Sequence, residues 1–134
     1  MKIYFIALIC ILVEIHAQDS KGMERKYSNA LLDCKKIHKV TFREVNDYYK
    51  LLEEGGSAAE SFCECLLRRL NCIDQNSKIM YNEFKKTPFP YAPSSGLNDI
   101  VDHCSYEKGS TCSKTAHKFL RCIEDSIQAM KPHN

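Results

Sequence analysis

Glycine and proline are scarce in this chain, with five glycines and four prolines among 134 residues. So few turn-forming residues are atypical of turn-dense all-β proteins and of low-complexity segments, and their scarcity favours helices. The composition, with 44% hydrophobic and 27% charged residues, is that of an ordinary globular protein. Because no internal repeat, linker or composition break interrupts the sequence, we expect a single domain.

An excess of charge of one sign is also lacking. The formal net charge is +2, and the 19 basic side chains are interspersed with 17 acidic ones. Proteins that bind nucleic acid usually carry a basic patch or stripe, and none is visible here. The sequence therefore predicts no nucleic acid partner.

No apolar run reaches the roughly 18 residues that a membrane-spanning helix needs. The longest run, residues 3–13, follows Lys2, and Ala17 then supplies the small residue that signal peptidase requires. We predict that residues 1–17 are a signal peptide and that residues 18–134 are a secreted domain without membrane insertion. An interfacial anchor helix is the alternative, but the order of charge, apolar run and small residue fits export better.

Motifs that would indicate catalysis or metal binding are missing as well. The chain has neither the Gly-x-Ser-x-Gly elbow of hydrolases nor the His-Glu-x-x-His of metalloproteases. Residues 74–78 fail as a calcium loop, since the glycine at position six and the glutamate at position twelve are absent. Cys63, Cys65 and Cys72 lack the Cys-x-x-Cys spacing of zinc knuckles. We expect no enzyme activity, no cofactor and no metal.

Helical periodicity runs through the rest of the chain, because apolar residues recur there every three or four positions. Thr41 and Ser57 are each followed by glutamate three residues later, a capping box that marks a helix start. Three prolines make residues 87–96 a loop. The predicted helices lie near residues 23–37, 41–54, 57–71, 76–84, 97–104 and 116–130. The prediction is an all-α fold, a compact array of about six helices packed at steep angles.

Cysteine is abundant. Without the signal peptide, seven cysteines remain, at positions 34, 63, 65, 72, 104, 112 and 122. An oxidising compartment lets disulfides persist, and an odd count leaves at least one thiol unpaired or paired between chains. Cross-links of this kind let a helical shell keep an apolar cavity that would otherwise favour collapse.

The cysteine spacing also carries a resemblance to a known family. The positions that match its six-cysteine frame are Cys34, Ser61, Cys65, Cys104, Ser113 and Cys122. Cys34 is followed by Val40 and a capped helix, and Cys65 is followed by an Asp-x-x-x-Lys turn at residues 74–78. Ser113 and Cys122 both fall in the last helix. The chain resembles the insect odorant-binding proteins (pheromone and general odorant-binding), and the two serines resemble their reduced-cysteine, C-minus-like branch.

The resemblance implies a disulfide pairing. In that family the first cysteine bonds to the third, the second to the fifth and the fourth to the sixth. Carried over, this pairing implies the bridges Cys34–Cys65 and Cys104–Cys122. Ser61 and Ser113 replace both cysteines of the middle bridge. This is the pattern expected when one disulfide is lost as a unit.

Three cysteines fall outside this frame. A displaced bridge between Cys63 and Cys112 stays open, although two residues on a helix rotate a side chain by about 200° and should turn Cys63 away from the face of Ser61. Cys72 is the best candidate for a free or intermolecular thiol. The alternative is that all three are reduced and behave as small apolar residues.

The family implies a soluble carrier that holds a small hydrophobic ligand non-covalently in an internal cavity. Odorants, pheromones and related semiochemicals or lipids are the implied ligands, an olfactory receptor is a further partner, and the carrier would be a monomer or a weak homodimer. A second hypothesis is a secreted helical ligand of a receptor, without an internal cavity. It predicts a solid core and an exposed apolar patch.

Side chains that line a cavity share their helical spacing with those that fill a solid core, so only their chemistry favours particular candidates. Flexible thioethers and flat rings suit varied ligands, and Tyr49 has a hydroxyl to donate to a carbonyl or alcohol. Phe89 and Tyr91, in the proline-rich loop, are the predicted mouth. The predicted ligand-binding residues are Tyr49, Leu52, Leu66, Met80, Phe84, Phe89, Tyr91, Ile100, Phe119, Leu120 and Ile123.

Overall fold

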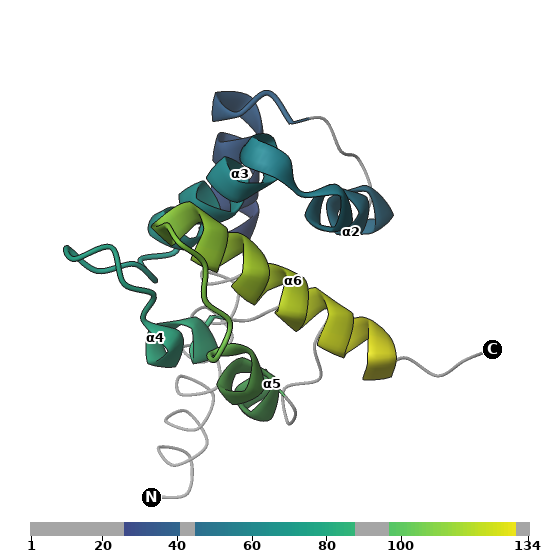
Figure 1. Ribbon diagram of the computed structural model, residues 1–134. Coiled ribbons are helices and arrows are strands. Elements are labelled where there is room, and N and C mark those ends of the chain that lie inside the picture. The colour runs from purple at the N-terminus through teal and green to yellow at the C-terminus, as the bar shows by residue number, and fades with distance from the viewer. Residues whose placement is uncertain (1–25, 41–44, 88–96, 131–134) are drawn as a thin grey trace, which may run out of the picture.

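The computed structural model describes residues 26–40, 45–87 and 97–130 (Figure 1). A helical segment at 26–37 is followed by α2 (Val45–Glu54), α3 (Gly56–Arg69), α4 (Tyr81–Lys85), α5 (Leu97–Cys104) and α6 (Cys112–Met130). The described residues contain no strand, only an isolated antiparallel bridge between Ile73 and Ile79. The predicted all-α fold is confirmed. The predicted signal peptide, the cap at Thr41 and the loop beyond Thr87 lie outside the described residues.

The long helix α6 is the centre of the fold. It packs against α2, α3 and α5, and α4 packs against α5. Figure 1 shows α6 running diagonally, with α2 and α3 on one side and α4 and α5 on the other. Its buried apolar residues follow the helical period and are Ala116, Phe119, Leu120, Ile123 and Ile127. In the described part of the chain, no helix is both long enough and apolar enough to span a bilayer.

Two glycines end α2, as the sequence predicts. Gly55 and Gly56 have φ angles of 67° and 86°, a conformation that glycine adopts without the steric cost of a Cβ atom. The Gly55 N–H donates to the Leu51 carbonyl at 3.1 Å, which closes the last turn. Because α3 begins at Gly56, almost no loop separates the two helices.

The fourth helix begins later than predicted. The sequence placed it over 76–84, whereas α4 starts only at Tyr81. Asp74 Oδ1 accepts hydrogen bonds from the backbone N–H groups of Asn76 and Lys78, at 2.8 and 2.9 Å. These bonds stabilise a turn that competes with helix, which is why the predicted start was wrong.

Two disulfides cross-link the helices. Cys34–Cys65 joins the 26–37 segment to α3, and Cys104–Cys122 joins α5 to α6, with Cα–Cα distances of 5.8 and 5.6 Å. Both bridges that the resemblance implies are therefore confirmed. On the loop-entropy model each contributes roughly 3–4 kcal/mol of stability.

The displaced bridge between Cys63 and Cys112 is not formed, and both thiols are free. Cys63 is fully buried in the core, whereas Ser61, two residues earlier on α3, lines a surface groove. Cys112 is only half-buried, and burial together with the Glu64 carboxylate raises the pKa of its thiol. Cys112 interacts with Glu64, which lies about 100° away from Cys63 around α3. The thiols of Cys63 and Cys112 therefore face different surroundings.

Cys72 is also a free thiol, as predicted, but it is fully buried. Its Sγ donates to the Leu70 carbonyl at 3.5 Å, and burial raises the pKa of the thiol. The suggested intermolecular bridge does not fit this position, because the sulfur lies inside the molecule.

Candidate functional site

Most of the predicted ligand-binding residues meet in one buried cluster. They come from α2, α3, α4, α5 and α6 and all lie below a tenth of full exposure. These residues are Leu52, Leu66, Phe84, Ile100, Phe119, Leu120 and Ile123. The structure thus brings together side chains that are distant in sequence, and their contact with a ligand stays a prediction.

The remaining predicted residues lie elsewhere. Tyr49 is half-buried, and its hydroxyl donates to Asp125 Oδ1 at 3.0 Å at an exposed position. That hydrogen bond raises the pKa of Tyr49 to about 12. Met80 is half-buried just before α4. Phe89 and Tyr91 are outside the described residues, so the predicted mouth stays a prediction.

Aromatic rings form one end of the core, which we call the aromatic end and define as Tyr81, Phe84 and Phe119. The Phe119 ring lies 5.1 Å from that of Tyr81 and 5.0 Å from that of Phe84, with interplanar angles of 70° and 78°. Edge-to-face pairs of this kind add to the stabilisation from burial. Tyr81 was not predicted, although its spacing of three residues from Phe84 places both on one face of a helix.

Polar side chains occupy the opposite part of the core, between α6, α2, α3 and the 26–37 segment. We call it the polar end and define it as Tyr27, Tyr48, Cys63 and Glu124, which are 5%, 6%, 0% and 1% exposed. Burial, reinforced by the other three groups, raises the pKa of Tyr48 well above its usual value. Burial likewise raises the pKa of the Cys63 thiol. Both groups therefore keep their protons at neutral pH.

Glu124 is one of the residues of this cluster that the sequence prediction missed. It is the one charged side chain that is buried among the described residues. Its position was readable, because it stands four residues after Leu120 and three before Ile127, on the apolar stripe of α6. A charged residue on such a stripe is the signal that could have found it.

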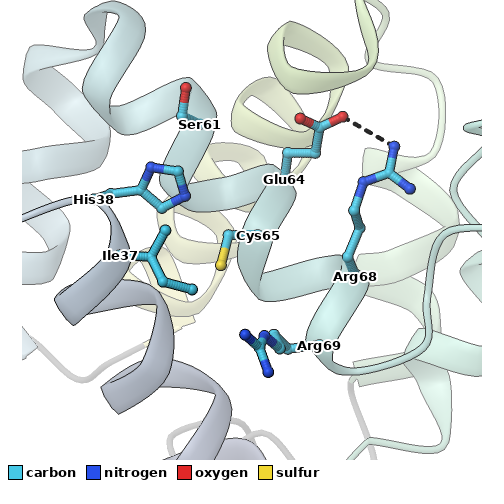
Figure 2. Close-up of a pocket in the computed structure, with 7 residues that line it drawn as sticks. All are labelled: Ile37, His38, Ser61, Glu64, Cys65, Arg68 and Arg69. Atoms are coloured by element: carbon cyan, nitrogen blue, oxygen red, sulfur yellow. Dashed lines mark hydrogen bonds and ion pairs between the residues drawn. The ribbon is translucent and has the colours of Figure 1, made fainter.

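A groove opens on the surface between the 26–37 segment and α3, with a volume of about 400 Å³. Figure 2 shows its lining, which consists of Ile37, His38, Ser61, Glu64, Cys65, Arg68 and Arg69. Arg68 pairs with Glu64 at 3.2 Å, and Arg69 lies 3.6 Å from Asp33. The groove contains none of the predicted ligand-binding residues. Five of its seven lining residues are polar or charged, in contrast to the apolar pocket that a carrier needs.

The histidines and acids of the described chain do not assemble into a metal centre. Within residues 26–40, 45–87 and 97–130, no three histidine, cysteine, aspartate or glutamate side chains are grouped to hold an ion. His117 is used structurally, since its Nε2 lies 2.7 Å from the Leu52 carbonyl and links α6 to α2.

Comparison with known proteins places the chain in a family. The model of the PBP/GOBP family matches residues 16–126. No curated protein and no solved structure matches the chain. The matched range includes both disulfides and the predicted ligand-binding residues. The chain therefore belongs to the PBP/GOBP family, the insect odorant-binding proteins.

Proposed function

We propose that the protein is a secreted carrier that binds one small hydrophobic molecule non-covalently within its helical core. Family membership over residues 16–126 is the observation that supports this function most strongly. The family's proteins bind ligands and are not enzymes, which agrees with the absence of catalytic motifs from the sequence. Odorants, pheromones and related semiochemicals or lipids are the proposed ligands, and an olfactory receptor is the proposed recipient.

The arrangement of the core suits this role. The 26–37 segment and helices α2 to α6 all contribute apolar side chains to one cluster, so the carbon surface of a ligand that enters it is removed from water on all sides. Such burial is favourable by about 25 cal/mol per Å². Two disulfides fix the 26–37 segment on α3 and α5 on α6, whereas α2 and α4 contain no cysteine. Movement of these two helices is our proposed route for admitting a ligand.

The missing middle bridge supports placing the protein in the reduced-cysteine branch. Ser61 lies on α3 and Ser113 in the first turn of α6, where family members have the second and fifth cysteines. A shell without this bridge should adapt to more ligands. Restoring the bridge with Ser61→Cys and Ser113→Cys should reduce the range of ligands that the protein binds. An unchanged range would contradict this proposal.

Displacement of a fluorescent naphthylamine probe from the oxidised mature protein tests the carrier function. Alcohols, esters, terpenes and fatty acids are the competitors. We expect saturable binding at one site with roughly micromolar affinity, about 8 kcal/mol. Phe119→Trp should abolish probe uptake by filling the core, while Tyr106→Trp adds the same ring at an 84% exposed position and should not.

Absence of uptake would overturn the proposal, provided that the protein is folded and both bridges are intact. Circular dichroism checks folding in each variant, and Met80→Trp at the half-buried edge is a second way to block the core if Phe119→Trp fails to fold. A folded protein without uptake would favour the receptor-ligand hypothesis. That hypothesis has support in the exposed Leu32 and Ile37 side chains on the 26–37 segment.

A further inference from the structure

The surface groove between the 26–37 segment and α3 is a cavity that the proposed carrier function leaves unused. Its volume of about 400 Å³ falls within the range of pockets that bind small molecules. Figure 2 shows Ser61, Cys65 and Arg69 along α3, opposite Ile37 and His38. The spacing of four residues places Ser61, Cys65 and Arg69 on one face of α3, with about 12 Å along the helix axis between the first and the last. One wall of the groove therefore has a hydroxyl at one end and a cation at the other.

The middle of the groove is apolar. Ile37 and the sulfur of Cys65, which belongs to the disulfide with Cys34, line it between Ser61 and Arg69. The Ile37 side chain is 54% exposed, so much of its carbon surface lies in water. A ligand that covers this surface gains the free energy of apolar burial. The groove thus offers a short apolar stretch that ends at a charged group.

The charged group is Arg69, and its hydrogen-bond donors are not used by the described part of the chain. Its Nη1 lies 3.6 Å from Asp33 Oδ2, which is longer than a hydrogen bond, and no other partner is present among the described residues. Both side chains of this ion pair are 50% exposed, and such pairs contribute little to stability. Arg68 differs, because its Nη2 donates to Glu64 and Ser77 at 3.2 and 3.3 Å. Arg69 is therefore the arginine of the groove that can donate to a ligand.

We propose that this groove is a second ligand site, which binds a small carboxylate with a short apolar chain. The guanidinium of Arg69 donates parallel hydrogen bonds to the carboxylate, and the chain covers Ile37 and the disulfide. An anion without a carbon chain, such as phosphate, leaves the apolar middle of the groove uncovered. An alcohol leaves Arg69 without an anionic acceptor. The site goes beyond the carrier function, because it uses none of the core residues on which that function depends.

Titration of the methyl-labelled, oxidised mature protein with sodium hexanoate, followed by NMR, tests this site. The methyl signals of Ile37 should shift and saturate, whereas n-hexanol at the same concentrations should leave them in place. Arg69→Gln should weaken hexanoate binding by about tenfold or more, because hydrogen bonds between charged groups are lost. Arg121→Gln is the matched control. It removes an arginine on α6 that is 48% exposed and pairs with Asp125, and it should leave the affinity unchanged.

Asp33→Asn is a second variant with an effect of opposite sign. It keeps Arg69 but removes the carboxylate that competes with the ligand for the guanidinium, so hexanoate should bind about two- to fivefold more tightly. This variant also keeps the inference testable if Arg69→Gln does not fold. An affinity that neither variant changes would overturn the inference.

The remaining outcomes separate this site from the core. Equal shifts of Ile37 with hexanoate and n-hexanol would show apolar contact without recognition of the carboxylate, and the inference would be wrong. Hexanoate shifts confined to Leu66 and Leu120 would place the carboxylate in the core and would also overturn it. If Ile37 responds as expected but the protein takes up no naphthylamine probe, the carrier function fails while this inference stands.

Discussion

The two ends of the core use the same helix differently. At the aromatic end, α6 places Phe119 against Tyr81 and Phe84 in edge-to-face contacts. At the polar end, the same helix buries the carboxylate of Glu124, which adds to the effect of burial in raising the pKa of Tyr48. Five residues of one helix thus separate an environment built by ring packing from one built by hydrogen-bonding groups. The amphipathic stripe of α6 therefore positions a carboxylate as well as apolar side chains.

The two disulfides also constrain different helices. Cys104–Cys122 joins α5 to α6 and closes the shorter segment, with a sequence separation of 18. Cys34–Cys65 holds the 26–37 segment on α3, with a separation of 31. The two bridges therefore close loops of different length.

Truncating the aromatic end should have the largest effect. Phe119 is fully buried and contacts two rings, so Phe119→Ala leaves a cavity and should lower the free energy of unfolding by about 3–5 kcal/mol. Urea denaturation followed by circular dichroism measures the loss. A loss below about 1 kcal/mol would mean that the rings do not pack as a core.

Removing a disulfide should be the next largest perturbation. Replacing both cysteines of either bridge with serine should cost roughly 3–4 kcal/mol of stability, and slightly more for Cys34–Cys65 because it closes the longer loop. The same denaturation assay, with the two double variants side by side, gives the comparison. A much larger loss for Cys104–Cys122 would show that strain or packing, and not loop length, dominates the difference.

A change of polarity without a change of shape should have a smaller effect. Tyr48→Phe keeps the ring that packs edge-on against Phe62 at 6.2 Å and removes only the hydroxyl. We expect a loss of about 0.5–1.5 kcal/mol in the free energy of unfolding. A loss as large as that of Phe119→Ala would contradict the distinction between the two ends.

Thiol reactivity gives the mildest test, because it leaves the chain unchanged. Of the three free cysteines, half-buried Cys112 should react with iodoacetamide first and fully buried Cys63 last. The raised pKa of each thiol lowers its thiolate fraction at neutral pH, so labelling should accelerate as pH rises. Mass spectrometry of the native protein should find Cys112 labelled, and unfolding should expose all three. Equal rates for Cys63 and Cys112 would mean that the polar end is open to solvent.

Much of the fold was predictable because helical period is a local property. The apolar spacing along α6 predicted that Phe119, Leu120 and Ile123 are buried, and the structure shows them fully buried. The start of α4 was not predictable in this way. The Asp74 hydrogen bonds that stabilise the preceding turn depend on side-chain geometry, which apolar spacing does not report.

The cysteines and the candidate site were also predictable only in part. Helix phase predicted that Cys63 turns away from Ser61, and the structure agrees. The pairing of the bridged cysteines came from the family resemblance, since spacing alone does not select partners. Glu124 was missed because a search for apolar side chains passes over a charged one on the same stripe.

Titration of the methyl-labelled, oxidised mature protein with n-octanol, followed by NMR, tests the central claim most directly. If the ligand enters the core, the methyl signals of Leu66, Leu120 and Ile123 should shift and saturate together, while that of Ile37 in the surface groove should not. Shifts confined to Ile37, or no shifts at all in a folded protein, would contradict the proposal that this protein carries its ligand inside the helical core.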